Sequence, residues 1–398
     1  MFTELYFGLI IQFSKLLLEP AASTSVPLAT LHILSGNFEM EFNSKIPLNQ
    51  KAIIQHENGI LRVTSGLTIQ QPGPSQILIR TKSVALNPCD FKMPLRFPTP
   101  GLWDGCDYAG IVVAVGSEVA KQGKFRLGDA VFGAVQGSNQ ADPTSGAYCE
   151  YLSIEQDFTF HIPSGLSFST APAISGTAIA TLGIALFWSL KIPGTLEAPS
   201  VTQEDVLVYA GSSTLGILAI QMVKLCGHRV ITTCSPRNFE LVRSYGADLV
   251  FDYNSVTCAK DIRTSTKNAL RYTLDPFSDV RSVSICQEAL GKTGGRYCGQ
   301  EQYQERLFSR RTVKHELVMG GAISGKGVQL PEPYGVAPNP EIRDWARIWY
   351  QVVQVLMNEG KIRPTPVEIL PGGLDAVIEG LDILKSGRVS GKKLVVIL

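Results

Sequence analysis

A strand, a glycine turn, a helix and a second strand follow one another over residues 205–235, and no other stretch constrains the fold as strongly. An apolar run ends at Tyr209, a turn of small residues follows, and apolar residues with helical spacing run from Leu215 to Leu225. Gly227 ends this pattern, and a second apolar run begins after it. The order predicts a βαβ unit and a parallel sheet covered by helices.

The turn of this unit resembles the G-x-G-x-x-G fingerprint of dinucleotide sites, because Gly211, Ser213 and Gly216 occupy the three glycine positions. The first glycine allows a tight turn, and the last lets the helix pack closely on the strand. Backbone N–H groups and the helix N-terminus would face a pyrophosphate. Serine replaces the middle glycine, so a plain βαβ turn is the alternative.

The end of the second strand indicates which dinucleotide would bind. An NAD site has an acidic residue there for the ribose 2′-hydroxyl, whereas this chain reads Cys234-Ser235-Pro236-Arg237-Asn238. Arginine with hydroxyl and amide donors suits a 2′-phosphate, which is a dianion. We therefore expect NADPH. The alternative is that Arg237 is a solvated arginine at the start of the next helix.

The composition is that of a globular enzyme. The 398 residues suggest two or three domains, and the net charge of +1 shows no nucleic-acid footprint. The 8 cysteines form no C-x-x-C pair and lie in expected core elements, which is typical of reduced thiols in the cytoplasm. Residues 1–45 lack a basic stretch before their apolar residues, so we expect a poorly ordered extension, or an extra amphipathic segment, rather than a signal peptide or membrane span.

The rest of the chain separates into a β-rich part and an α/β part. Alternating residues predict short strands over 46–165, an apolar helix over 171–190, and alternating strands and helices over 180–329 that form a doubly wound parallel sheet. An amphipathic helix is expected from Trp345 to Asn358. The closing KKLVVIL has no apparent parallel partner nearby in sequence, so we expect this strand to return to the first domain.

Eight segments resemble those of known families. Five of them are NPCD (87–90), GCDYAGIVVAVG (105–116), RLGDAVFG (126–133), VLVYAGSSTLG (206–216) and SGKKLVVIL (390–398). With the layout, they resemble the medium-chain dehydrogenase/reductase superfamily over about residues 46–398. The other three are TCSPRNFELVRSYGADLVFDY (233–253), TKNALRYTLD (266–275) and PEPYG (331–335). They are similar to trans-acting enoyl reductases of fungal polyketide pathways, the lovastatin type.

The resemblance implies a fold, a reaction and partners. It implies a GroES-like catalytic domain from residues 46–179 and 330–398, and a Rossmann NADPH-binding domain from residues 180–329. It also implies zinc-independent, NADPH-dependent reduction of an enoyl thioester in secondary-metabolite biosynthesis. The thioester would be held on the acyl carrier domain of a highly reducing polyketide synthase whose own reductase domain is inactive. A monomer is expected.

The resemblance also implies site residues by position. The expected cofactor contacts are Cys89, Asp90, Phe91, Lys92, Ser212, Ser213, Thr214, Leu215, Ser235, Pro236, Arg237, Asn238, Tyr253, Gln300, Glu301, Val389 and Ser390. Glu301 fits this role least well, because a carboxylate near phosphates is unfavourable. The expected acyl-channel residues are Ala180, Thr181, Leu182, Gly183, Ile184, Ala185, Leu186, Phe187, Gly320, Gly321, Ala322, Ile323 and Ser324. Small and apolar side chains there leave room for a polyketide, with the 320–324 segment as the opposite wall; the alternative is packed core.

Zinc is not expected. Zinc alcohol dehydrogenases of this superfamily use a Cys and a His as first-domain ligands, and here Cys106 stands where the His would be. Cys89 is shifted within its motif, and no four-cysteine lobe lies between Gly133 and Cys149. A catalytic zinc needs three protein ligands in a fixed arrangement, so both cysteines are expected to be buried thiols.

Without a metal, conjugate reduction needs hydrogen-bond donors for the enolate oxygen. Lys92 is the candidate catalytic donor; its alternative role is a contact to a cofactor phosphate or ribose. Tyr108 is a second candidate, with packing as its alternative, and Asp129 is expected to be structural. Two other functions stay open: a free-standing zinc-free quinone or alkenal reductase, and a non-catalytic NADPH-binding relative.

Overall fold

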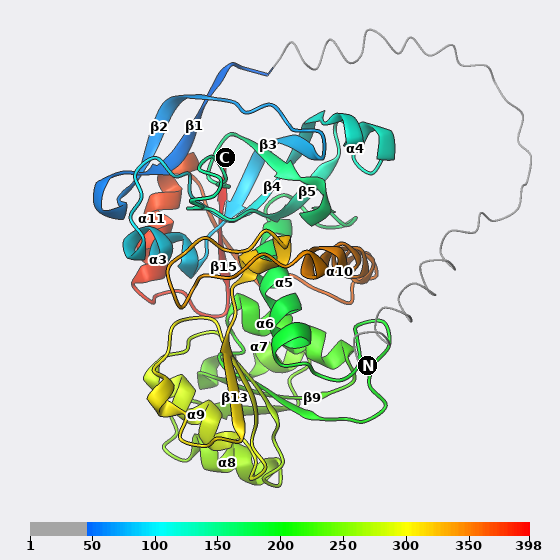
Figure 1. Ribbon diagram of the computed structural model, residues 1–398, viewed down its shortest axis with the longest axis vertical. Coiled ribbons are helices and arrows are strands. Elements are labelled where there is room, and N and C mark those ends of the chain that lie inside the picture. Colours follow the sequence, from blue (N-terminus) through cyan, green and yellow to red (C-terminus); the bar gives the residue numbers. More distant parts are fainter. Residues whose placement is uncertain (1–45) are drawn as a thin grey trace, which may run out of the picture. The chain divides into compact units, whose positions relative to one another are not determined.

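The computed structural model describes residues 46–398 (Figure 1). The expectation for residues 1–45 lies outside the described residues. Two large sheets carry the fold, and a hairpin of β1 (Asn49–Gln55) and β2 (Leu61–Thr68) accompanies the first. Short 3₁₀ helices connect several elements: η1 (Glu57–Gly59), η2 (Gln156–Phe158), η3 (Ala171–Ile174), η5 (Pro236–Asn238), η6 (Glu305–Leu307) and η7 (Gly320–Ser324).

The first sheet has seven strands in the order β14-β15-β3-β4-β5-β7, with β6 also paired to β3. Two helices, α3 and α4, come between its strands, and α10 and α11 follow the second sheet in the chain. Their bounds are β3 (Gln76–Ala85), α3 (Pro88–Arg96), β4 (Asp107–Val115), α4 (Ser117–Gln122), β5 (Ala130–Ala134), β6 (Tyr151–Glu155), β7 (Thr159–His161), α10 (Pro340–Asn358), β14 (Val367–Leu370), α11 (Gly373–Lys385) and β15 (Lys393–Ile397).

The closing strand joins the first sheet, as the sequence predicted. β15 pairs antiparallel with β3 through Val395 and Ala85. The sequence missed β14, which pairs in parallel with β15, so the expectation that no parallel partner lies nearby in sequence is wrong. Side chains from β15, α11 and β3 share one core cluster, which includes Val396, Val377 and Val84.

The second sheet is parallel and has the strand order β10-β9-β8-β11-β12-β13. This is the doubly wound order in which ligands bind at the carboxyl ends of the central strands. The predicted fold class, a β-barrel-type domain with a Rossmann sheet, is therefore confirmed. The elements are β8 (Asp205–Val208), α6 (Thr214–Leu225), β9 (Arg229–Cys234), α7 (Phe239–Ser244), β10 (Leu249–Asp252), α8 (Cys258–Ser265), β11 (Tyr272–Asp275), α9 (Val280–Ala289), β12 (Gly295–Gly299) and β13 (Val313–Leu317).

The apolar segment 171–190 differs from its prediction as one helix. It divides into η3, α5 (Gly176–Gly183) and the π-helical η4 (Ile184–Ser189). The break lies at Ser175, whose φ of 66° is left-handed. Its hydroxyl donates to Asp107 Oδ2 at 2.7 Å and accepts from the Ala178 N–H, so the local polar contacts outweigh helix continuity.

The segment Ala171–Ser189 is long and apolar enough to cross a membrane, but 83% of its apolar window is buried inside the protein. That burial is typical of a core helix. α5 contacts β5 of the first sheet and α6 of the second, and Figure 1 shows α5 between the two sheets. The predicted domain boundary near residue 180 therefore falls inside a helix that contacts both parts.

Candidate functional site

The glycine turn after β8 has the close contacts that a dinucleotide turn requires. A Cβ at Gly211 would lie 2.0 Å from Thr232 Oγ1, and one at Gly216 would lie 2.4 Å from the Ala210 carbonyl oxygen. Only glycine fits either position without a clash. Ser213 caps α6, because its Oγ accepts the Gly216 N–H at 3.0 Å. Capping explains why serine stands at the middle position of the fingerprint.

Several predicted cofactor residues meet at the carboxyl edge of the second sheet. The Asn238 side-chain amide donates to Ser212 Oγ at 3.1 Å and to Ser390 Oγ at 2.9 Å. The hydroxyls of Ser235 and Tyr253 lie 3.0 Å apart. Four segments separated in sequence thus place hydroxyl and amide groups at this edge, beside the N-terminus of α6. The neighbouring Pro236 and Arg237 lie in η5 and are exposed, and Thr214 and Leu215 lie in the first turn of α6.

Sequence reasoning missed Arg281 at this edge. Its guanidinium carbon lies 5.3 Å from the centre of the Tyr253 ring. Arg281 lies in the first turn of α9 after β11, whereas Tyr253 follows β10. Parallel strands bring the ends of β10 and β11 to one edge, where Tyr209 and Phe277 also lie 6.3 Å apart, ring centre to ring centre. The only signal in the sequence was the βαβ alternation itself, which does not select Arg281 among many arginines.

Gln300 and Glu301 follow β12 at the same edge of the sheet. Their backbone N–H groups donate to Ser278 Oγ at 3.0 and 3.3 Å. Within residues 46–398, the buried Nε2 of Gln300 has no hydrogen-bond partner. A ligand carbonyl group would satisfy this donor, so the orphaned amide fits a bound nicotinamide or acyl group.

The Glu301 carboxylate is neutralised by α3. Lys92 Nζ lies 3.2 Å from Oε2, Arg96 donates to Oε1 at 2.5 Å, and the Tyr334 hydroxyl also donates to Oε1. Burial raises the pKa of Glu301. The hydrogen bonds from Arg96 and Tyr334 and the charge of Lys92 together outweigh this effect, so the pKa of Glu301 lies below its usual value. Lys92 and Arg96 balance the negative charge of Glu301, so this carboxylate would repel a nearby cofactor phosphate less than an unpaired one.

The other predicted residues on α3 have structural contacts. Asp90 is 1% exposed, and its Oδ2 accepts the Asn87 N–H at 2.7 Å and the Tyr148 hydroxyl at 2.5 Å. Phe91 and Val389 pack against the core cluster that includes Leu86. Asp90 is buried, whereas Phe91 and Val389 are half-buried, and the contacts of all three residues with a cofactor stay predictions.

Two thiols and a carboxylate meet beside α3. Cys89 Sγ lies 4.0 Å from Cys106 Sγ and 3.5 Å from Asp90 Oδ1. The hydrogen bond with Cys106 lowers the pKa of the Cys89 thiol, but burial raises it and the net direction is upward; the hydrogen bond with Cys89 and burial raise the pKa of Cys106 well above its usual value. The three donor atoms lie within 4.8 Å of one another, and three protein ligands are what a catalytic zinc requires. A metal here would have to displace the protons of two thiols whose pKa values are raised.

The alternative readings of Tyr108 and Asp129 fit the structure. Tyr108 is 0% exposed, and its hydroxyl lies 3.0 Å from Thr159 Oγ1. Burial raises the pKa of Tyr108, so this phenol is a poor proton donor and a packing residue. Asp129 accepts the Arg126 N–H at 2.8 Å and closes a turn.

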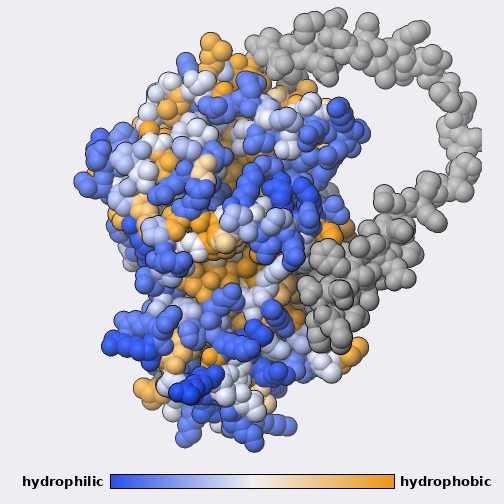
Figure 2. Space-filling model, in the orientation of Figure 1, coloured by the Kyte–Doolittle hydropathy of each residue, from blue (hydrophilic) through white to orange (hydrophobic). Residues whose placement is uncertain are grey.

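The two predicted acyl-channel segments contact each other. A Cβ at Gly320 would lie 2.4 Å from Thr181 Oγ1, so α5 and η7 are adjacent at this point. That the two segments form opposite walls of an acyl channel stays a prediction. A Cβ at Gly183 would lie 2.9 Å from Trp349 Nε1, which makes Gly183 a packing position against α10. Figure 2 shows hydrophobic residues gathered across the middle of the visible face. The remaining residues, Ala180, Leu182, Ile184, Ala185, Leu186, Phe187, Gly321, Ala322, Ile323 and Ser324, are buried or half-buried.

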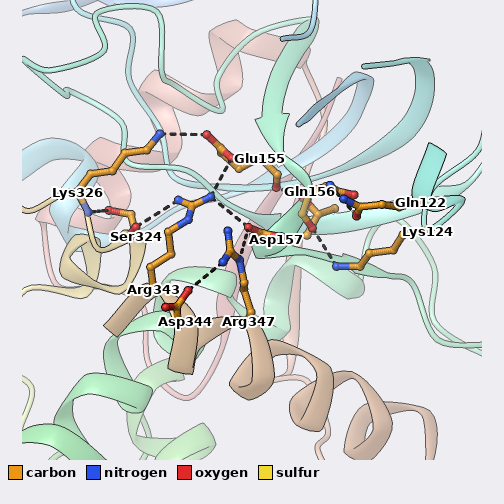
Figure 3. Close-up of polar contacts among 11 residues, drawn as sticks. Gln122, Lys124, Glu155, Gln156, Asp157, Ser324, Lys326, Arg343, Asp344 and Arg347 are labelled. Carbon is orange, nitrogen blue, oxygen red and sulfur yellow. Dashed lines mark hydrogen bonds and ion pairs between the residues drawn. The ribbon is translucent and has the colours of Figure 1, made fainter. Parts of the chain in front are cut away.

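An ion-pair network holds η7 and α10 against the first sheet (Figure 3). Arg343 donates to the Ser324 carbonyl at 3.2 Å and pairs with Glu155 at 3.2 Å and Asp157 at 3.1 Å. Lys326 Nζ lies 3.0 Å from Glu155. Arg343 of α10 therefore links the carbonyl of the predicted residue Ser324 to Glu155 of β6 and Asp157 of η2.

Comparison with known proteins defines the class first. Residues 73–164 match the alcohol dehydrogenase GroES-like domain, and residues 214–332 match the zinc-binding dehydrogenase family. A putative zinc-dependent alcohol dehydrogenase protein from Rhizobium etli has a TM-score of 0.72 and 24% identity, covering 89% of this chain and 99% of that one. The CurK enoyl reductase has a TM-score of 0.69 and 17% identity over 87% of this chain and 99% of that one. These similarities show the dehydrogenase/reductase fold.

Curated relatives define the particular family. Enoyl reductase cheB of Chaetomium globosum is 46% identical over 368 residues, covering 91% of this chain and 96% of that protein. Trans-enoyl reductase RAP1 of Pyricularia oryzae is 48% identical over 353 residues, covering 88% of this chain and 98% of that protein. The chain therefore belongs to the trans-enoyl reductase family, and the resemblance found in the sequence is confirmed.

Proposed function

We propose that this chain is a trans-acting enoyl reductase that uses NADPH to reduce the α,β-double bond of an acyl-carrier-bound polyketide thioester. The observation that carries this proposal is the similarity to trans-enoyl reductases along almost the whole described part of the chain. The partner is a highly reducing polyketide synthase. The enzyme acts as a monomer in the cytoplasm, where eight free cysteines stay reduced.

The geometry supports a phosphorylated dinucleotide. The tight turn at Gly211 and Gly216 and the N-terminus of α6 suit a pyrophosphate. Ser235, Arg237 and Tyr253 place donors where an NAD enzyme has an acid, which suits a 2′-phosphate. Further along the edge, Gln300 offers a buried donor that has no partner among residues 46–398.

Conjugate reduction of an enoyl thioester sets the requirements that the site must meet. Bound at the turn of Gly211 and Gly216, NADPH would supply a hydride for the β-carbon. The negative charge that then develops on the thioester carbonyl oxygen would need a positioned cation or hydrogen-bond donor, and a proton delivered to the α-carbon would complete the reduction. Lys92, 41% exposed and 3.2 Å from Glu301, is the candidate for this role or for a cofactor contact. Ala180 to Phe187 and Gly320 to Ser324 supply the apolar surroundings that an acyl chain needs.

The test is substrate-dependent consumption of NADPH by the purified chain. We expect turnover of a crotonyl-pantetheine thioester, with a product two mass units heavier on account of the added hydride and proton, and little turnover of quinones. Turnover of quinones without thioester reduction would instead identify a free-standing quinone reductase. Tight NADPH binding with no accepted substrate would identify a non-catalytic relative.

A further inference from the structure

One carboxylate connects three segments that are far apart in the sequence. Glu301 follows β12 of the second sheet, Lys92 and Arg96 lie on α3 beside the first sheet, and Tyr334 lies in the loop before α10. Lys92 Nζ is 3.2 Å from Oε2 and Arg96 is 2.5 Å from Oε1, and Tyr334 donates to Oε1. The Glu301 side chain is only 17% exposed, whereas Lys92 is 41% and Arg96 is 36% exposed.

The two carboxylate oxygens have different partners. Oε1 is held by Arg96 and Tyr334, which also contact each other: the guanidinium carbon lies 4.8 Å from the tyrosine ring centre. The Tyr334 hydroxyl is fixed in turn, because it accepts the Gln302 N–H at 3.2 Å. Oε2 contacts Lys92. One side of the carboxylate is therefore anchored, and the other side holds a single flexible cation.

Stability alone does not explain this arrangement. Lys92 and Arg96 have i, i+4 spacing on α3, where like charges repel each other. Partly exposed ion pairs contribute little to folding. A lysine side chain has four rotatable bonds and much conformational freedom, so a lysine that acts on a ligand gains from a partner that restricts it beforehand.

We infer that Glu301 is a positioning residue: Arg96 and Tyr334 fix its carboxylate, and the carboxylate holds the Lys92 ammonium at the carboxyl end of β12. The inference rests on the proposed role of Lys92 in binding or turnover. Glu301 itself then contacts neither cofactor nor substrate through its side chain. Its effect on the reaction passes through Lys92 alone.

A double-mutant cycle tests this inference. We expect Glu301→Ala to lower kcat/KM for crotonyl-pantetheine by about 10- to 100-fold, because misplaced reacting groups cost that much. The same substitution in a Lys92→Ala background should cause no further loss. Glu301→Asp should recover part of the activity, and Glu301→Gln, which keeps the shape but not the charge, should recover less. NADPH affinity, measured by fluorescence titration, should change in the same way in Lys92→Ala and Glu301→Ala.

Glu359→Ala is the matched control, because Glu359 forms an exposed ion pair with Lys361 at 2.8 Å; it should leave kcat/KM and affinity unchanged. Equal losses from Glu301→Ala with and without Lys92 would show an independent structural role and overturn the inference, as would full activity of Glu301→Ala. If Lys92→Ala alone changes neither affinity nor turnover, Glu301 has nothing to position and the inference also fails. Enoyl reduction by the unmutated chain, measured beside these variants, tells failure of this inference from failure of the proposed function.

Discussion

Two lysine–carboxylate ion pairs lie at α3. Their N···O distances are nearly the same, but one pair is buried and the other is partly exposed to solvent. At its N-terminal end, Lys393 Nζ lies 3.1 Å from Asp107 Oδ2, with side chains 4% and 0% exposed. Toward its C-terminal end, Lys92 Nζ lies 3.2 Å from Glu301 Oε2, with side chains 41% and 17% exposed. The contrast separates a charge pair that fixes the helix from one that a ligand can reach.

The buried pair is completed on every side by polar groups. The Asn87 amide donates to Asp107 Oδ2 at 3.0 Å, Ser175 donates to the same oxygen at 2.7 Å, and Thr177 donates to Oδ1 at 2.8 Å. Lys393 also donates to Asn87, the N-cap of α3. Since no member can leave without stranding a charge, this cluster ties α3 to β4, β15 and α5. The solvent-facing pair has no such enclosure, so Lys92 can exchange partners at little cost.

Removal of Lys393 should give the largest effect. Lys393→Met leaves Asp107 buried without a countercharge, and we expect a loss of ~3 kcal/mol or more in the free energy of unfolding. Lys392→Met is the control, because Lys392 pairs with Glu368 at 2.7 Å with both side chains more than 40% exposed; its cost should be ~0–1 kcal/mol. Urea denaturation measures both. Equal stabilities of the two variants would remove the distinction between the pairs.

A cationic side chain that faces solvent should contribute to ligand affinity rather than to the free energy of unfolding. Arg237, which is exposed, tests this expectation. Arg237→Ala should weaken NADPH binding by ~1.5–3 kcal/mol, the usual value for a hydrogen bond to a charged group, and leave NADH binding and stability unchanged. Arg243→Ala is a suitable control, since Arg243 is exposed and paired with Glu240 at 2.5 Å. Titration calorimetry with both cofactors decides. Equal affinities of the unmutated protein for NADPH and NADH would contradict the expected specificity.

The same contrast explains how much of the fold the sequence could predict. The βαβ unit, the doubly wound sheet and the return of the closing strand follow from apolar periodicity, which reflects burial and is visible locally. The break at Ser175 was missed because it depends on Asp107, which is distant in the chain. β13 was also missed, since its residues Lys314 and Glu316 make the strand look polar.

The candidate site was predictable where a motif fixes the backbone and not where charges meet across the fold. Ser212, Asn238 and Ser390 were expected together and are hydrogen-bonded. Arg96 and Tyr334 carried no signal, because their partner Glu301 lies on the other sheet's edge. The one available signal was the position of Glu301 near an expected phosphate. Two anionic groups so close together would require cationic side chains from another part of the chain.

The stabilising contribution of the ion pair at Glu301 should depend on pH, and the direction of the Glu301 pKa shift defines how. The pKa of Glu301 is lowered on folding, so its ionised form stabilises the protein above the ordinary glutamate pKa of about 4.3, and this contribution is lost as the pH falls through the lower folded-state value. Lys92, Arg96 and Tyr334 face the carboxylate. We expect Glu301→Gln to cost ~1 kcal/mol or less at neutral pH, after allowance for solvent screening.

The unfolding free energies of the two proteins, measured by urea titration from pH 7 to pH 3.5, should therefore converge toward the acid end. The difference between them isolates Glu301 from the other carboxylates, which titrate in both proteins. A difference that stays constant with pH would mean that Glu301 contributes through shape and hydrogen bonding and not through its charge.

The smallest effect is expected at the thiols between the two charged clusters. Cys89 and Cys106 have raised pKa values, so a metal would have to displace two protons, and Asp90 Oδ1 would have to exchange its contact with the Cys89 thiol for the metal. We expect elemental analysis of the purified protein to find no stoichiometric zinc, and prolonged treatment with a chelator to leave both the unfolding free energy and thioester reduction unchanged. About one zinc per chain, lost together with activity, would show that the thiols ionise in the folded protein. It would also make a Lewis acid available, and reduction of a carbonyl group would then compete with reduction of the double bond.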